Sequence, residues 1–162
     1  MNKCLLCRKK SKDKLCSKHS LEYIWDSSIH GYRRKKRNTG SRYTLDLFHK
    51  TETQLVKILE HFYGPENIVT SYRPLWAVSS KGALFEFDIY IKNMDILVEY
   101  NGKQHYCFTK IFHKNRKGFL NQKRRDSEKF ALVNKQGVTL VVFNYDEPIV
   151  NDYVINKISN NK

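Results

Sequence analysis

Two acidic residues stand where their neighbours predict buried strands. Residues 85–91 alternate apolar and polar side chains, a period of two that is typical of a strand with one face on a core. Asp88 is on the other face of this predicted strand, and Glu99 follows an apolar run over residues 96–98. A buried carboxylate is costly unless it binds a metal or a cation. Asp88 and Glu99 therefore indicate a magnesium site on adjacent strands; solvated strand ends are the alternative.

Residues 1–19 hold a second set of metal-ligand types. Cys4 and Cys7 form one pair, Cys16 and His19 form another, and each pair is separated by two residues. Thiolates and an imidazole at these spacings suit tetrahedral zinc. The segment has little apolar content, so a metal would supply most of its folding free energy. We expect one structural zinc ion here; a disordered basic tail with chance cysteines is the alternative.

The charge of the chain points to a polyanionic partner. Its 162 residues carry a formal net charge of +14 and a pI of about 9.7, which favours nucleic acid first and an anionic membrane surface second. There is no apolar run near the roughly 18 residues of a membrane span and no signal-peptide pattern. We therefore expect an intracellular protein, in the cytoplasm of a bacterial or phage-infected host.

The basic residues are concentrated in the first third of the chain. Residues 20–50 read as a linker with one short helix around residues 21–25, followed by five consecutive cations: Arg33, Arg34, Lys35, Lys36 and Arg37. Such a block repels itself when free and should become ordered against phosphates. We expect these five to contact DNA; a solvated loop or a nuclear-localisation signal is the alternative.

The remaining segments predict one α/β domain. An apolar stripe predicts a helix over residues 51–63, and a strand follows at 67–72. After the two strands that carry Asp88 and Glu99, a second helix is expected over 118–136, a buried strand over 138–143 and a short C-terminal helix beyond. Helices that alternate with strands in this order favour a three-layer core with a mixed sheet.

This order, together with Asp88 and the run Glu99-Tyr-Asn-Gly-Lys-Gln-His105, resembles the PD-(D/E)XK nuclease superfamily. The nearest subset is the phage and mobile-element endonucleases similar to restriction and very-short-patch-repair enzymes, and the Cys/His segment resembles the zinc knuckles that precede such enzymes. A further match on the second helix comprises Phe119, Gln122, Asp126 and Lys129. The resemblance covers roughly residues 48–145 and implies a restriction-endonuclease-like core. We therefore expect three parts: a zinc knuckle at 1–20, a basic DNA-binding linker at 21–47 and the nuclease-like core at 48–162.

The resemblance also assigns roles to acidic residues. It implies that Asp88 and Glu99 hold Mg²⁺, which would activate water for hydrolysis of a phosphodiester bond. Glu52, in the predicted first helix, resembles the extra acid that some members use. Asp126 and Lys129 are interpreted instead as an ordinary pair on a helix.

The chain departs from the family at its lysine. Asn101 stands two residues after Glu99, where the pattern has Lys. Lys103 is our second choice for the residue that supplies the missing cation. We also expect Lys103 to contact DNA. Gln104 and His105 carry the family signature and are expected to assist catalysis, His105 as a general base or a phosphate donor; a core histidine near a strand end is the alternative.

Two functions follow as expectations. The first is a magnesium-dependent endonuclease acting on double-stranded DNA, as a site-specific homing or mobile-element enzyme. The second is a non-catalytic DNA- or RNA-binding protein on a degenerate nuclease fold. One chain has one site and cuts one strand, so double-strand cleavage would need a homodimer or two separate events.

Overall fold

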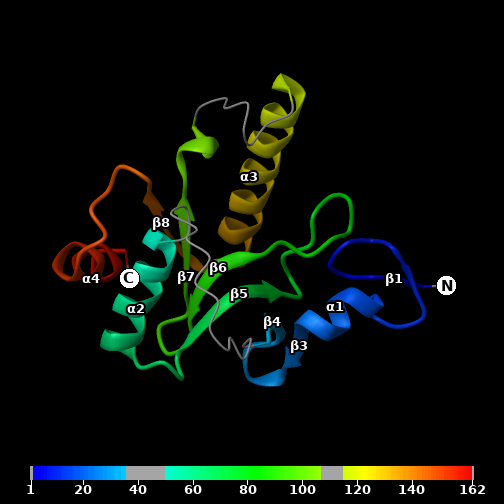
Figure 1. The fold of residues 1–162 in the computed structure, drawn as a ribbon, viewed down its shortest axis with the longest axis horizontal. Coiled ribbons are helices and arrows are strands. Elements are labelled where there is room, and N and C mark those ends of the chain that lie inside the picture. The colour runs from blue at the N-terminus through cyan, green and yellow to red at the C-terminus, as the bar shows by residue number, and fades with distance from the viewer. Residues whose placement is uncertain (1, 36–49, 107–114, 162) are drawn as a thin grey trace.

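A six-stranded sheet forms the centre of the computed structural model, which describes residues 2–35, 50–106 and 115–161 (Figure 1). The strand order is β3-β4-β5-β6-β7-β8, and every neighbouring pair is antiparallel except β7 and β8, which are parallel. The strands are β3 (Tyr23–Asp26), β4 (Gly31–Arg34), β5 (Ile68–Pro74), β6 (Phe87–Ile91), β7 (Ile96–Asn101) and β8 (Thr139–Asn144).

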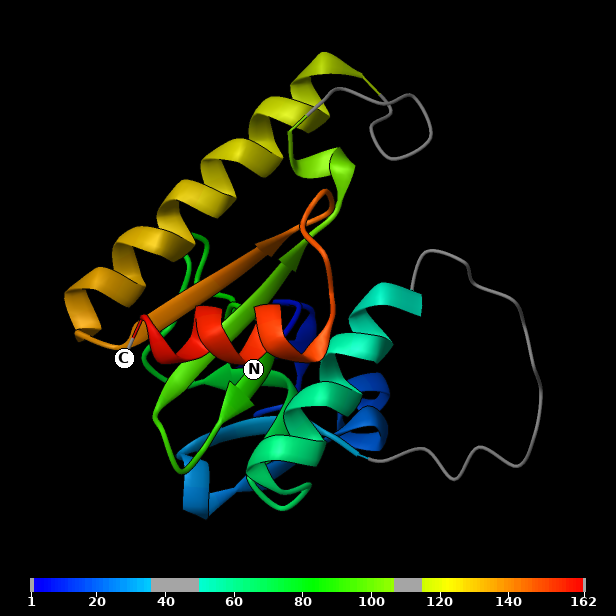
Figure 2. The ribbon, with the colours of Figure 1, turned by 90° about the vertical axis from the view of Figure 1, so that its left-hand side faces the viewer.

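Helices cover both faces of this sheet (Figure 2). On one face lie α2 (Lys50–Tyr63) and α4 (Asn151–Ser159), whose buried side chains Leu55, Leu59 and Val154 pack on strands β5 to β8. On the other face lies α3 (Arg116–Gln136), which contributes Val133 to a second core. Gly137 ends α3 with a φ of 73°, a left-handed conformation that glycine adopts without strain. The prediction of an α/β protein with a mixed sheet between helices is confirmed.

The predicted single apolar face over residues 85–91 is wrong. Ile89 and Ile91 pack with α2 and α4, whereas Phe85 and Phe87 belong to the core under α3. The ladder between β5 and β6 is interrupted at Ser71, which has a φ of 53°. The interruption lies opposite Asp88, and the buried residues of β6 on either side of this point, Phe87 and Ile89, belong to different cores.

Residues 21–35 also differ from the expected linker and short helix. The helix α1 (Ser17–Glu22) ends before Tyr23, and the chain continues as β3, the 3-10 turn η1 (Ser27–Ile29) and β4. Aromatic and β-branched side chains favour strands, and here Tyr23 is buried at the sheet edge. Because β4 pairs with β5 near Gly31, Arg33 and Arg34 belong to the main sheet.

The N-terminal segment packs against this same edge. A small hairpin of β1 (Asn2–Lys3) and β2 (Lys10–Ser11) precedes α1, and Cys4 and Leu6 share a third buried cluster with Tyr23, Tyr32 and Leu84. The backbone N–H of Leu84 donates to the carbonyl of Leu5 at 2.9 Å. Within the described ranges, no helix is both long and apolar enough to cross a membrane.

Candidate active site and metal centre

The four predicted zinc ligands come together between the β1–β2 hairpin and α1. The ligand atoms of Cys4, Cys7, Cys16 and His19 all lie within 4.8 Å of one another. His19 Nδ1 is 3.4 Å from both Cys4 Sγ and Cys16 Sγ, and Cys7 Sγ is 3.7 Å from Cys16 Sγ. A tetrahedron with Zn–S bonds of about 2.3 Å has S···S edges of about 3.8 Å. The geometry therefore fits a single tetrahedral metal ion.

The protonation of these thiols also suits a metal. Burial alone would raise the pKa of the Cys4 thiol, but hydrogen bonds from the backbone at Cys16 and Leu6 and from His19 lower that pKa to about 6. Burial raises the pKa of the Cys7 thiol. The lowered pKa of Cys4 favours the thiolate, which is the form that ligates metal.

Asp88 and Glu99 occupy the point where β6 and β7 separate. The last backbone-paired residues are Ile89 and Val98, and the same register places Asp88 opposite Glu99 one step further on. At this point carboxylate side chains, and not backbone carbonyls, accept the N–H groups of the neighbouring strand. The N–H of Asp88 donates to Glu99 Oε1 at 3.2 Å, and the N–H of Tyr100 donates to Asp88 Oδ2 at 2.8 Å. The two carboxyl groups are therefore held across the gap between neighbouring strands.

One cation accompanies these two acids. Lys129 extends from α3, forms an ion pair with Glu99 Oε1 and lies 4.4 Å from the centre of the Phe87 ring. The side chains of Lys129 and Glu99 are only 14% and 13% exposed. Burial raises the pKa of Asp88, and it raises the pKa of Glu99 to about 7 even though the Lys129 ammonium opposes the shift. Two partly buried carboxyl groups with a single ammonium beside them can accommodate further positive charge.

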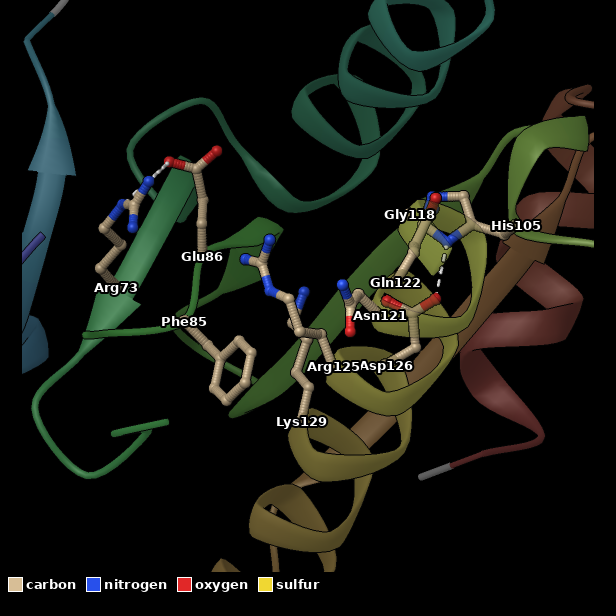
Figure 3. A pocket seen from close by; sticks show the side chains of 10 residues that line it. All are labelled: Arg73, Phe85, Glu86, His105, Gly118, Asn121, Gln122, Arg125, Asp126 and Lys129. Atoms are coloured by element: carbon tan, nitrogen blue, oxygen red, sulfur yellow. Dashed lines mark hydrogen bonds and ion pairs between the residues drawn. The ribbon is translucent and has the colours of Figure 1, made fainter. Parts of the chain in front are cut away.

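A cleft of about 440 Å³ opens next to Lys129 (Figure 3). It lies between α3 and a wall formed by Arg73 of β5 and by Phe85 and Glu86, which precede β6. Lys129 lines the cleft and also forms the ion pair with Glu99, so it connects the opening with the two partly buried acids. The lining residues are Arg73, Phe85, Glu86, His105, Gly118, Asn121, Gln122, Arg125, Asp126 and Lys129.

His105 reaches the cleft from the 3-10 turn η2 (Lys103–His105), which follows β7. Its Nδ1 lies 3.1 Å from Oδ2 of Asp126 on α3 (Figure 3). A carboxylate at Nδ1 fixes the orientation and the tautomer of an imidazole ring, which leaves Nε2 for other partners. Asp126 therefore contacts a predicted site residue, and the interpretation of Asp126 and Lys129 as an ordinary helix pair is wrong in this respect.

The opposite wall of the cleft is connected to the N-terminal part of the chain. Arg73 Nε donates to Glu86 Oε2 at 3.0 Å, and the Tyr23 hydroxyl donates to the same oxygen at 2.7 Å. Arg73 also donates to the carbonyl of Leu84. Tyr23 belongs to the buried cluster around Cys4. Its hydrogen bond to Glu86 therefore connects the Cys/His segment with the wall of the cleft.

Other predicted site residues lie elsewhere. Glu52 is in the first turn of α2, in the helix layer opposite α3. Lys103 is exposed in η2, and the ion pair of Glu99 is formed by Lys129 instead. The side chain of Gln104 lies outside the described residues.

The basic block is largely engaged within the protein. Arg33 Nε is 2.9 Å from Asp26 Oδ2, Arg34 is 4.0 Å from Glu22, and Lys35 Nζ donates to the carbonyl of Ser20 at 3.0 Å. Lys36 and Arg37 lie outside the described residues. Antiparallel pairing of β3 and β4 brings Asp26 and Glu22 next to the first two arginines.

Sequence reasoning gave too little weight to Lys129, and it missed Arg73 and Glu86. The signal for Lys129 was present, because it stands in register with Phe119, Gln122 and Asp126 on the second helix of the resemblance. Arg73 and Glu86 had no such signal, since their contact depends on how β5 lies against the segment before β6.

Comparison with known proteins finds viral relatives. No family model matches the chain, and no solved structure matches it significantly. The chain is 41% identical over 73 residues to uncharacterized protein 307L of Invertebrate iridescent virus 6, which is 45% of this chain and 37% of the relative. It is 39% identical over 64 residues to uncharacterized protein 033L of Invertebrate iridescent virus 3, which is 40% of this chain and 33% of the relative. It is 34% identical over 74 residues to uncharacterized protein 094L of Frog virus 3, which is 45% of this chain and 48% of the relative. The matched segment thus spans less than half of each of these relatives.

Proposed function

We propose that the protein is a magnesium-dependent endonuclease that hydrolyses phosphodiester bonds of double-stranded DNA, as a site-specific homing or mobile-element enzyme. The observation that carries this proposal is the pair of partly buried carboxyl groups of Asp88 and Glu99, which lie opposite each other on neighbouring strands. It is supported by the net charge of +14 and by the resemblance to PD-(D/E)XK nucleases over the same residues.

The two acids fit a magnesium ion. Mg²⁺ is commonly bound by one or two carboxylates together with water and substrate phosphates, and not by a full cage of protein ligands. Here the backbone N–H groups of Asp88 and Tyr100 orient the two carboxyl groups before any metal binds. When bound, magnesium would lower the pKa of a water molecule and neutralise charge on the scissile phosphate.

Lys129 supplies the ammonium that the family pattern places two residues after Glu99. Asn101 occupies that position and hydrogen-bonds the hydroxyl of Tyr106 at 3.3 Å. Lys129 comes from α3 instead, and it lines the cleft next to Glu99. An ammonium there stabilises negative charge that develops on a phosphate in the transition state.

His105 is placed to handle a proton at the edge of the cleft. Asp126 accepts from or pairs with Nδ1, so Nε2 is left to accept a proton from water or to donate to a phosphate oxygen. In this scheme Asp126 is a positioning residue. The Cys4, Cys7, Cys16 and His19 cluster binds one structural zinc ion and fixes the wall that holds Glu86.

One observation favours the second candidate, a non-catalytic DNA- or RNA-binding protein on a degenerate nuclease fold. Glu99 already has an ammonium partner and Asp88 already accepts an amide N–H, so both acids are satisfied without a metal. Such pairing is also what a structural ion pair under a helix would show.

Cleavage of supercoiled plasmid separates the two candidates. The nuclease converts plasmid to open-circular or linear DNA when magnesium is added, and Asp88→Asn does not, although it binds the same DNA. Omitting magnesium is preferable to adding a chelator, because a chelator would also remove metal from the Cys/His cluster. Intact plasmid with the parent protein, combined with tight binding, supports the binding protein instead.

A further inference from the structure

A second hollow lies directly beside the cleft. Its volume is about 180 Å³, and Phe85 and Arg125 line both cavities, so the two adjoin. One wall is α3, and the other is the loop of residues 79–84. The amide of Ser80 donates to the carboxylate of Glu128, which holds this loop against α3.

Three cations converge on this hollow. Lys81 comes from the loop, and Arg124 and Arg125 come from α3. All three residues are exposed, and none of them forms an ion pair with an acid in the part of the chain that the structure describes. Glu128 is the one acidic side chain in the lining, and it is engaged with the loop. The hollow therefore has an excess of positive charge next to the cleft.

This arrangement contrasts with the basic block of β4. Arg33 and Arg34 already have the carboxylates of Asp26 and Glu22 close by. A cation that keeps an internal partner gains less from a phosphate, because the existing pair must be given up. Arginine pairs that are free of acids, in contrast, offer planar groups that match phosphate oxygens.

We propose that Lys81, Arg124 and Arg125 form a phosphate seat that holds the sugar-phosphate backbone of duplex DNA alongside the cleft. The inference rests on the proposed function for the choice of DNA as the ligand. Arg125 faces both cavities, so a strand held in the seat continues past Lys129 and Glu86 (Figure 3). Contacts of this kind position a duplex without reading its sequence.

The test is binding of a fluorescently labelled 30-base-pair duplex of arbitrary sequence, measured by anisotropy in magnesium-free buffer between 50 and 200 mM salt. Each phosphate contact contributes about 0.9 to the slope of log K against log salt, or roughly tenfold in affinity at 0.1 M salt. We expect the variant Lys81→Ala/Arg124→Ala/Arg125→Ala to lose about one to three decades of affinity and a matching part of the slope.

A charge-matched control removes three other exposed cations. Lys57 lies on α2, Lys135 lies near the end of α3, and Lys123 is next to Arg124 in sequence but about 100° away around the helix. The variant Lys57→Ala/Lys123→Ala/Lys135→Ala should keep most of the affinity. Glu128→Gln should act in the opposite sense, since it keeps an acceptor for Ser80 and removes the negative charge, so binding should tighten.

Several outcomes would overturn the seat. Equal losses of affinity in the two triple variants would show that only the net charge of the protein matters. An unchanged salt slope in the seat variant would show that Lys81, Arg124 and Arg125 do not contact phosphates. Tighter binding of duplex RNA than of duplex DNA through the same three residues would contradict the choice of DNA. The two proposals can fail separately. If the seat variant binds DNA normally and the parent protein cuts plasmid, only the phosphate seat is refuted. If the seat variant loses DNA binding and the parent protein never cuts plasmid, only the nuclease activity is refuted.

Discussion

Asp88 and Glu99 face each other one step beyond the last backbone pair of β6 and β7, and each accepts an N–H from the opposite strand. The two acids thus satisfy the backbone N–H groups of Asp88 and Tyr100 at the point where the strands separate. Their rotamers are fixed by the backbone before a ligand arrives. Preorganised acids of this kind bind a cation with little loss of side-chain entropy.

The raised pKa of Glu99 predicts a pH dependence of stability. In the unfolded chain this carboxyl should titrate near its ordinary value of 4.5, whereas burial raises its pKa to about 7 in the fold. The folded state therefore holds more protons in this range, and the free energy of unfolding contributed by Glu99 falls as pH rises from about 4.5 through about 7. Urea unfolding in magnesium-free buffer should show Glu99→Gln becoming more stable relative to the parent at pH 8 than at pH 5. A constant difference between the two proteins would contradict the assignment.

The Cys/His cluster predicts metal-dependent folding of the sheet edge. Cys4→Ser should reduce zinc from about one ion per chain to near zero, and it should lower the melting temperature, because Cys4 is fully buried among Leu6, Tyr23 and Leu84. Metal analysis of purified protein and thermal unfolding measure the two effects. Cys107→Ser is the matched control, since Cys107 is outside the predicted ligand set. Zinc that stays bound after Cys4→Ser would exclude this site.

Much of the fold could be predicted from local patterns. The apolar stripe of α2 belongs to a segment whose side chains meet one core within a few residues, so periodicity predicts this helix well. Periodicity also predicts that residues around Asp88 form a strand, but not that their apolar side chains divide between two cores. The β3–β4 hairpin could not be predicted in this way, because its two strands are short and rich in basic and aromatic residues. Their conformation depends on the pairing of β4 with β5. The division of Phe87 and Ile89 between two cores lies opposite the left-handed Ser71 of β5, and the alternation in the sequence does not signal this break.

The candidate site likewise contains groupings that local sequence patterns predict and contacts that they do not predict. The proximity of Asp88 and Glu99 could be predicted because each breaks an apolar pattern on a neighbouring strand, and the grouping of Cys16 with His19 because their spacing is short. The ion pair of Lys129 with Glu99 joins residues thirty positions apart. Such a contact depends on how α3 lies across the sheet, and no periodicity within α3 determines that placement.

The contact between His105 and Asp126 predicts a non-additive effect on cleavage. His105→Ala should slow the reaction by up to about two decades, at the low end of general acid–base catalysis. Asp126→Asn should slow it less, because the ring stays but is no longer held at Nδ1. The double variant should be no slower than His105→Ala alone, as expected when one residue acts through another. Multiplied losses in single-turnover rates would instead assign Asp126 an independent role.

Lys129 predicts a rescue experiment. Lys129→Met should reduce the cleavage rate by about two to three decades, comparable to the removal of one preorganised electrostatic donor. It should also raise the pKa of Glu99 further, since the ammonium that opposes the shift is gone. Asn101 follows Glu99 by two positions on β7, so Asn101→Lys returns a cation to the same face of the strand. Adding Asn101→Lys to Lys129→Met should restore part of the rate, and no recovery would argue that Lys129 serves only the ion pair.

The acids themselves give the most decisive prediction. Asp88→Asn and Glu99→Gln should each abolish magnesium-dependent plasmid cleavage, because either change removes a charged oxygen ligand while keeping the side chain's size. DNA affinity should be unchanged or slightly tighter, since negative charge leaves a site that already sits near Lys129 and Arg125. Gel assays of cleavage with magnesium and anisotropy without it measure the two properties on the same protein. Undiminished cleavage by Asp88→Asn would place the catalytic site elsewhere, and loss of binding together with cleavage would show that the acids hold the fold and not the metal.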